Sequence, residues 1–402
     1  MESLRKWLLP LAILSLPWQT RYIFFVSATP DAGYQTEWGV YAFYASWILI
    51  IVAWLFSFLH DRTFVGPKKW HLFAIGLFLV SILVNFTLYS VQFVAQVFVL
   101  LLLGDALRRE QWSRSRLAAW FVASLLPHAL LAVWQFDSQT VFASKWLGIS
   151  HQDPANAGVS VIAHEGERIL RGYGGFPHPN IAGIWFALGL AASFWLIRNA
   201  ETKWAGLLGW FMCVILPFAL VLTFSRSAFL AAFILLGATC FMIFARRPVD
   251  VFLLRPFIWS LICFLTITVL VWPLLLSRGS IENHLEIKSV SERASSWTGI
   301  WPSIGEHPFI GHGIGSSGIQ AQPPHAVPLI ILFETGLLGL LSVGILFVAI
   351  WKYTDLLGRV LLASLVPPFL LDHYFYSLWA GISLLILAIY FICMLDKIPD
   401  SR

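Results

Sequence analysis

Apolar runs of about 20 residues, separated by polar turns, recur along the chain and constrain its fold more than any other feature. A run of this length crosses the hydrocarbon core of a bilayer as an α-helix. Of the 402 residues, 58% are hydrophobic and only 12% are charged, which is unlike an ordinary soluble protein. The runs are too long for a barrel of short alternating strands, so the sequence predicts an all-α polytopic membrane protein.

We expect about twelve transmembrane helices, which form a single transmembrane domain over residues 1–402. Their approximate ranges are 7–27, 39–59, 71–88, 91–107, 117–135, 180–198, 204–222, 226–244, 257–277, 326–350, 358–371 and 376–395. Two longer segments, over about 136–179 and 278–325, interrupt this pattern, whereas every other connection is short. A large substrate head group is therefore expected to bind at these two segments.

Lysine and arginine are unevenly distributed over the connecting segments. If both termini are cytoplasmic, the cytoplasmic segments carry 18 of the 26 basic residues, and the two long segments lie on the opposite side. The positive-inside rule favours this orientation. The net charge of +5 then reflects topology and contact with anionic membrane lipid, and we expect no nucleic-acid partner.

Arg226 lies on the predicted outer side, where the positive-inside bias would remove an arginine without a function. A helix that starts near Ser225 would place free backbone N–H groups beside this guanidinium. Together they would form a site for phosphate oxygens. The alternative is an arginine that only extends its side chain to the membrane interface.

The second long segment contains a predicted short helix. Ser289 and Glu292 have the spacing of a capping box, so we expect the helix to start there. Arg293, Trp297 and Trp301 would then share one face, which could bind a glycolipid. The alternative is an interfacial helix whose tryptophans only anchor it in the membrane.

His325 lies just before a predicted span and is a candidate base. A neutral imidazole can take a proton from a sugar hydroxyl, although an interfacial histidine without a catalytic role is the alternative. His307 and His312 lie in the same segment, but the spacing of the three histidines matches no metal signature. We therefore expect no metal site and no cofactor. The glycines around His312 lack the strand of a dinucleotide loop and indicate a turn or a close approach of the backbone to a sugar.

Two further outer segments carry candidate substrate-binding residues. The first long segment ends with Arg171, His178 and Asn180. We expect Asn180 to be the N-cap of the next helix, while Arg171 and His178 could line a substrate cleft. Asp372 and His373 form the turn between the last two predicted spans. A carboxylate there could orient a histidine base, and an ordinary polar turn is the alternative.

Together these residues resemble the O-antigen ligase family, which includes O-antigen polymerases and protein O-oligosaccharyltransferases. The family's pattern of a histidine, a polar residue, nine positions and Gly-x-x-Gly is met by His325, Gly336 and Gly339. Its Thr-x-Ser-Arg-x-Ala segment is met by Thr223, Ser225, Arg226 and Ala228, and its Pro-Asn segment by Pro179 and Asn180. Ala326 departs from the pattern, because the family usually has Asn, Ser or Gln there.

The resemblance implies a GT-C-like, metal-independent, inverting glycosyltransferase of the bacterial inner membrane. It would transfer a glycan from undecaprenyl diphosphate to an acceptor hydroxyl on the periplasmic face, with the lipid A-core as the first candidate acceptor. By the same resemblance, Arg226 and Arg293 would bind the donor diphosphate and stabilise its charge as it leaves. His325 would activate the acceptor.

Three alternatives remain at this point. Within the family, the acceptor could be a pilin-type Ser or Thr, or the reaction could be polymerisation of the glycan. From another class, a flippase or transporter of a lipid-linked glycan would need charged residues deep within its spans. The ionisable groups singled out above gather at the predicted outer face, which favours an enzyme.

Overall fold

The computed structural model describes residues 2–26, 40–61, 76, 79, 83, 86, 88–245, 249–279, 284–319 and 324–394. In this part of the chain, seven helices are long and apolar enough to cross a membrane: α4 (Leu88–Arg109), α5 (Arg114–Ser138), α6 (Pro179–Asn199), α7 (Lys203–Leu222), α8 (Arg226–Phe244), α9 (Val251–Leu270) and α13 (Val327–Tyr353). Shorter apolar helices are α2 (Ala45–His60), α14 (Leu356–Leu371) and α16 (Trp379–Cys393). The protein is thus a mostly helical, multi-pass membrane protein, as predicted.

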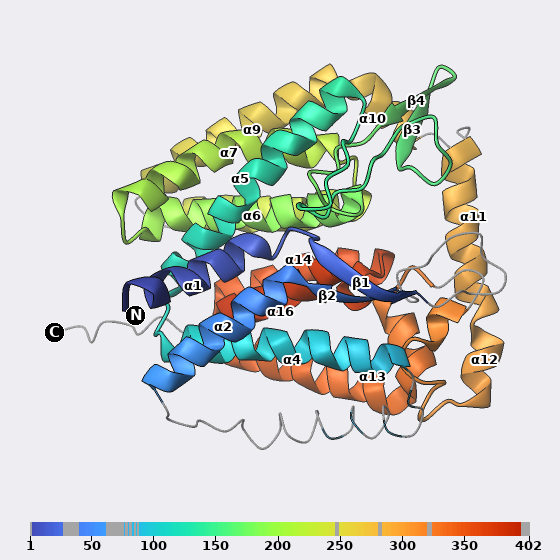
Figure 1. The fold of residues 1–402 in the computed structure, drawn as a ribbon. Helices are drawn as coiled ribbons and strands as arrows, with labels where there is room; N and C mark the ends of the chain where they lie inside the picture. The colour runs from blue at the N-terminus through green and yellow to red at the C-terminus, as the bar shows by residue number, and fades with distance from the viewer. Residues whose placement is uncertain are drawn as a thin grey trace.

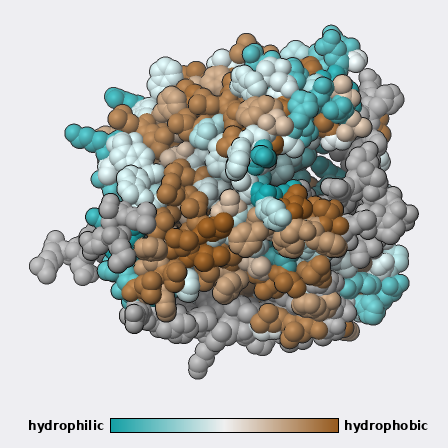
Figure 2. Space-filling model, viewed as in Figure 1, coloured by the Kyte–Doolittle hydropathy of each residue, from teal (hydrophilic) through white to brown (hydrophobic). Residues whose placement is uncertain are grey.

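The predicted number of about twelve spans is not reached among the described residues, where seven helices qualify by length and composition. The predicted span 71–88 lies mostly outside the described residues. Figure 2 shows apolar residues over much of the helical body and hydrophilic ones toward its ends, the surface pattern of a protein embedded in lipid.

The long helices lie side by side (Figure 1). Helix α6 packs against α5, α7 and α8, and most of its residues are buried. The short helices α10 (Trp272–Gly279), α11 (His284–Gly299) and α12 (Trp301–Glu306) gather at one end of the bundle with the antiparallel hairpin of β3 (Val161–His164) and β4 (Glu167–Leu170). We call this the loop end. Helix α1 (Glu2–Ser15) begins at the opposite end, where Arg114 contacts the carbonyls of Phe391 and Ile392 at the end of α16.

The first predicted span, 7–27, is wrong in its second half. Helix α1 ends at Ser15, and residues Arg21–Val26 form strand β1, which pairs with β2 (Val40–Tyr44). Pro17 disfavours a continuing helix, because proline has no backbone N–H to donate a hydrogen bond. The run Arg-Tyr-Ile-Phe-Phe-Val that follows is rich in residues that favour strands. The apolar composition alone could not distinguish this hairpin from a continuing helix.

The predicted span 257–277 is also interrupted. Helix α9 ends at Leu270, and the separate helix α10 begins at Trp272 with Pro273 in its first turn. Proline is tolerated in a first turn because the N–H groups there have no partner within the helix. The break redirects the chain, so that Arg278 at the end of α10 belongs to the loop end.

Helix α13 is broken at Gly336, whose backbone is left-handed with φ of 63°. The loop before it supplies the hydrogen bonds that the break removes. The N–H groups of His312 and Gly313 donate to the carbonyls of Phe333 and Glu334, and the N–H of Leu337 donates to the carbonyl of Pro308. A break in the backbone of an apolar helix is tolerated when protein groups satisfy its hydrogen bonds in this way. The glycines around His312 thus form a turn against α13, which confirms the predicted turn.

Glu334 joins this loop to the neighbouring helices. Its side chain is fully buried and accepts hydrogen bonds from the backbone N–H and the hydroxyl of Ser317. It also accepts a hydrogen bond of 2.6 Å from the hydroxyl of Tyr376, in the short helix α15 (Tyr374–Ser377). The break in α13 and the turn that carries His373 are therefore held together by one carboxylate.

Replacing Gly336 by alanine is expected to destabilise the protein by more than about 1 kcal/mol, because a side chain is strained at this φ. An added Cβ would also lie 2.3 Å from the carbonyl carbon of Phe309. Gly344→Ala is the matched control in the same helix, where a Cβ meets nothing within 4 Å. The melting temperatures of the purified variants in detergent measure the effect. A wild-type melting temperature for Gly336→Ala as well as for Gly344→Ala would contradict this role of Gly336.

Candidate active site

Three arginines from three different helices meet in one cavity at the loop end. Arg226 is the first residue of α8, Arg278 is near the end of α10, and Arg293 lies in α11. They line a cavity of about 430 Å³ together with Trp297 and Asp372. We call it the arginine cavity. Helix α8 begins where it was predicted to, because Ser225 caps it by accepting a hydrogen bond from the N–H of Ala228.

The positive charges of the arginines in this cavity repel one another. Burial, and after it the positive charges of Arg171, Arg226 and Arg293, lower the pKa of Arg278 to about 8, whereas the carboxylate of Asp372 acts in the opposite direction. Gathering like charges in a partly buried site is unfavourable unless an anion compensates them. Guanidinium groups bind phosphate oxygens through paired hydrogen bonds, so the cavity is suited to a phosphate or diphosphate group.

A larger cavity of about 690 Å³ adjoins the first one. Its lining includes His325 and His373, and it shares Asn180, Arg278, Arg293 and Asp372 with the arginine cavity. We call it the histidine cavity. Because the two cavities share these four residues, an anion held by the arginines would lie next to the space in front of the two histidines.

His325 and His373 form a pair, with ring centroids 5.0 Å apart. Burial, together with the charge of Arg293, lowers the pKa of His325 to about 4. Burial lowers the pKa of His373 to about 3, with the same direction of effect from His325 and Arg293. Both imidazoles are therefore neutral at pH 7, and each can accept a proton.

Hydrogen bonds orient the ring of His373. Ser377 donates its hydroxyl proton to the carbonyl of His373 and lies 2.6 Å from the Nδ1 atom of the same residue. Nδ1 consequently carries the ring proton and donates it to the Ser377 oxygen, which leaves Nε2 as the acceptor atom. The structure differs here from the predicted orientation of a histidine by Asp372, because the His373 ring contacts Ser377 whereas Asp372 accepts hydrogen bonds from Asn180 and Ser227.

Asp372 belongs to a buried chain of polar side chains. Its two oxygens accept hydrogen bonds from Asn180 at 2.9 Å and from Ser227 at 2.8 Å. Asn180 in turn accepts a hydrogen bond of 2.6 Å from Arg171, which also donates to the carbonyl of Thr223. The chain ties together the end of the first long loop, α6, α8 and the end of α14. Arg171, Asn180 and Asp372 thus border the cavities while also holding their walls.

Alanine at position 372 is expected to lower the stability of the protein. The buried donors of Asn180 and Ser227 would lose their acceptor, at a cost of about 1–3 kcal/mol for each donor. Asp372→Asn keeps an oxygen acceptor and is expected to lose less. The control is Glu165→Ala, which removes a carboxylate whose side chain is 85% exposed. Equal melting temperatures for Asp372→Ala and Glu165→Ala would argue against this role.

The predicted N-cap at Asn180 is wrong by two positions. His178 is the N-cap of α6, because its Nδ1 atom accepts a hydrogen bond from the N–H of Asn180, and Pro179 occupies the first helical position. Its Nε2 atom lies 2.8 Å from the hydroxyl of Ser160. Burial lowers the pKa of His178 well below its ordinary value. His178 therefore lines the histidine cavity as a neutral capping residue.

The predicted face of Arg293, Trp297 and Trp301 is only partly formed. Helix α11 begins at His284, so Ser289 and Glu292 lie inside it and do not form a capping box at its start. The helix ends at Gly299, and Trp301 begins α12, where it is 54% exposed. Arg293 and Trp297 stay together in the arginine cavity, whose described lining does not include Trp301.

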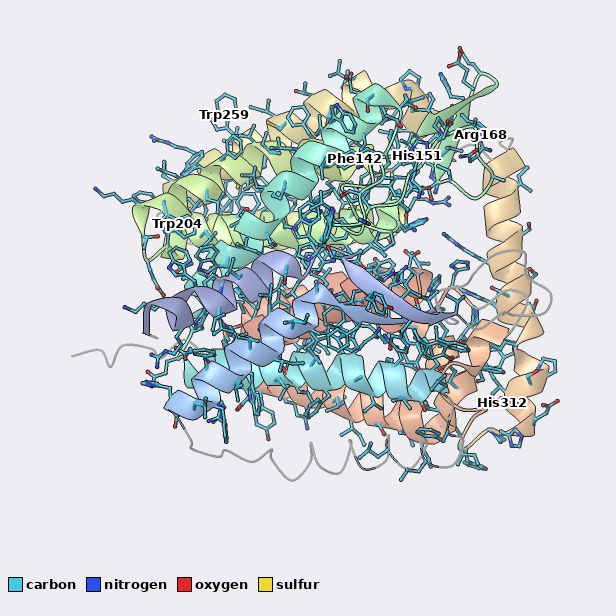
Figure 3. All side chains as sticks on the ribbon, viewed as in Figure 1. Phe142, His151, Arg168, Trp204, Trp259 and His312 are labelled. Carbon is cyan, nitrogen blue, oxygen red and sulfur yellow. The ribbon has the colours of Figure 1, made fainter. Side chains whose placement is uncertain are left out.

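The histidines of the second long segment lie in two different places. The rings of His307 and His312 contact each other with centroids 4.9 Å apart, whereas His325 contacts His373. Figure 3 shows His312 near α12, on the other side of the loop end from Arg168. His325 therefore contacts a histidine from a distant part of the sequence.

Arg278 is the residue that sequence reasoning missed. It directly follows the predicted span 257–277, and no local pattern assigns it a function. The break at Val271 and the contact of the β3–β4 hairpin with α10 bring it into the arginine cavity. His164 of β3 lies 2.7 Å from the hydroxyl of Ser277, next to Arg278.

Residues 211–344 match the family model for O-antigen ligase. The matched part begins within α7 and ends within α13. It contains the three arginines of the arginine cavity and His325, whereas Asn180, Asp372 and His373 lie outside it. No curated protein matches this chain. This match supports the predicted resemblance of the chain to the O-antigen ligase superfamily.

Proposed function

We propose that this protein transfers a glycan from undecaprenyl diphosphate to an acceptor hydroxyl on the periplasmic face of the bacterial inner membrane. Both termini would then lie in the cytoplasm. One observation carries the proposal: a cavity lined by three arginines adjoins a cavity that is lined by two neutral histidines. The first suits a diphosphate leaving group, and the second suits proton transfer from a hydroxyl.

The proposed reaction is a single displacement. The acceptor oxygen forms a bond to the anomeric carbon while the bond from that carbon to the diphosphate oxygen breaks, and the electron pair leaves with the diphosphate. The hydroxyl proton passes to His325 and from there to solvent. Arg226, Arg278 and Arg293 stabilise the negative charge that develops on the leaving oxygen. A single displacement inverts the configuration at the anomeric carbon.

The charge on the leaving group is the reason that we propose a metal-independent reaction without a cofactor. In many phosphate-transfer sites a divalent cation neutralises such charge, but here the arginine cavity presents three guanidinium groups, which would repel a cation. The diphosphate is already a good leaving group, so no nucleotide is needed to activate the sugar.

We propose the lipid A-core of lipopolysaccharide as the acceptor. A pilin-type Ser or Thr and the end of a growing glycan are the other acceptors compatible with the same chemistry. A flippase for the lipid-linked glycan is the candidate from another class. The grouping of Arg226, Arg278, Arg293, His325 and His373 at one end of the bundle favours an enzyme, because a translocation path needs polar groups along its length.

A strain that lacks the gene is expected to lose its surface glycan and to regain it with the wild-type gene. The variants His325→Ala, Arg226→Ala and Arg293→Ala should fail to restore it while reaching wild-type amounts in the membrane. Full restoration by all three variants would contradict the assignment of the site.

A further inference from the structure

The β3–β4 hairpin contacts both parts of the proposed active site. Val161 of β3 and Arg168 of β4 line the histidine cavity. Strand β3 also packs against the short helix α10, beside which it lies at the loop end (Figure 1). Helix α10 carries Arg278, which lines the arginine cavity. The hairpin therefore connects the wall of one cavity to a charged group of the other.

The alternation of side chains along β3 accounts for this double contact. Successive side chains of a strand point to opposite faces. Val161 lines the histidine cavity, whereas Ile162 is buried in an apolar cluster against which Leu274 and Leu275 of α10 pack. His164 follows Ile162 by two positions and shares its face. One face of the strand thus borders the histidine cavity, and the other supports α10.

His164 forms a hydrogen bond with the residue that precedes Arg278. Its Nδ1 atom lies 2.7 Å from the hydroxyl oxygen of Ser277. Ser277 donates its own proton to the carbonyl of Pro273 at 3.1 Å, four residues earlier in α10. Because the hydroxyl proton is used within the helix, the Ser277 oxygen is the acceptor and the Nδ1–H group of His164 is the donor. The imidazole therefore holds the last turn of α10 from outside the helix.

Arg278 needs such a support because its own helix is short. Helix α10 has eight residues, none of them buried, and the break at Val271 separates it from α9. A helix of this length has little stability of its own and is fixed by the elements against which it packs. The positive charges of Arg226 and Arg293 repel the guanidinium of Arg278. If α10 were loosely held, this repulsion would displace the guanidinium from the cavity.

We propose that His164 is a positioning residue for the glycan transfer: through Ser277 it fixes the last turn of α10 and holds the guanidinium of Arg278 where the diphosphate binds. This inference rests on the proposed function. His164 is not among the described residues that line either cavity, so it acts through Arg278 and does not touch the substrate. It also lies outside residues 211–344, so the match to the family model does not account for it.

The test uses the purified full-length protein in lipid nanodiscs, with a lipid-diphosphate-linked glycan as donor and a saccharide acceptor. His164→Ala is expected to lower kcat/KM for the donor about tenfold, the effect of about one lost hydrogen bond. His164→Asn places an amide N–H group close to the position of the imidazole Nδ1–H and should restore most of the rate. Glu167→Ala, at an exposed position of the same hairpin, is the control with the wild-type rate.

A double-mutant cycle distinguishes positioning of Arg278 from a general structural role of His164. If His164 acts through this guanidinium, His164→Ala should cause no further loss of rate in the Arg278→Ala protein. A general weakening of the hairpin would lower the rate by the same factor in both backgrounds. The same tenfold loss with and without Arg278 would therefore overturn the proposal.

Binding of inorganic pyrophosphate without donor or acceptor, measured by titration calorimetry, separates this inference from the proposed function. Affinity that falls about tenfold in His164→Ala, returns in His164→Asn and is unchanged in Glu167→Ala supports the positioning role even if no glycan is transferred. A wild-type transfer rate and wild-type pyrophosphate affinity in His164→Ala would overturn the positioning role and leave the transferase function intact.

Discussion

Replacing Arg278 by alanine is expected to lower kcat/KM for glycan transfer by about 10²- to 10³-fold, the usual loss when one fixed donor to a developing oxyanion is removed. Arg278 lines both the arginine cavity and the histidine cavity. Among the described residues, the others that line both are Asn180, Arg293 and Asp372. Its guanidinium is therefore placed where a diphosphate would leave the sugar. Transfer by the purified protein in lipid vesicles measures the effect.

Two variants separate the role of this guanidinium from a general effect of charge. Lys145→Ala removes one positive charge from the first long loop, where the ammonium contacts the ring of Trp146, and should transfer glycan at the wild-type rate. Arg278→Lys keeps a hydrogen-bond donor at this position but loses the planar pair of donors, so an intermediate rate is expected. A rate for Arg278→Ala within threefold of wild type would remove this residue from the proposed mechanism.

Replacing His325 by alanine is expected to lower transfer by about 10²- to 10⁴-fold, the range for the loss of a general base. The base must be neutral to accept the acceptor proton. Since burial and the charge of Arg293 lower the pKa of His325 to about 4, activity should persist down to that pH and fall as the imidazole is protonated. The pH dependence of kcat/KM reports this ionisation in the free enzyme.

The effect of Arg293 on His325 also predicts the direction in which the pKa of His325 shifts when Arg293 is replaced. Arg293→Gln removes a positive charge that disfavours the imidazolium form of His325, so the pKa of His325 should rise and the acidic decline in kcat/KM should move to higher pH. The remaining rate will be lower, because Arg293 also lines the arginine cavity, but the shape of the profile is independent of its height. An unmoved acidic decline would show that these two residues are not coupled.

Local signals in the sequence were sufficient for part of this site. Ser225 before an apolar run predicted the start of α8, and that placed Arg226 correctly. The cap preference of Asn gave a wrong prediction at Asn180. The histidine two positions earlier accepts the capping hydrogen bond instead, which a preference for Asn does not reveal. Pro179, which favours the first helical position, was the available signal for a cap at His178.

Contacts between distant segments could not be predicted from one sequence. Asn180 and Asp372 are 192 positions apart and share a hydrogen bond, and no local pattern indicates that they meet. The pairing of His325 with His373 was missed for the same reason. The position of Arg278 in the arginine cavity was not predicted, because an apolar run gives little indication of a helix break. Pro273 is the one local signal that a new helix, α10, begins there.

The most direct test of the central claim measures both products of the reaction in sealed vesicles that contain only the purified protein, the lipid-diphosphate-linked glycan and a saccharide acceptor. One free lipid diphosphate is expected for each glycosylated acceptor, with the same yield in the presence of a chelator. Movement of an intact donor across the bilayer without release of lipid diphosphate would contradict the account and indicate a flippase.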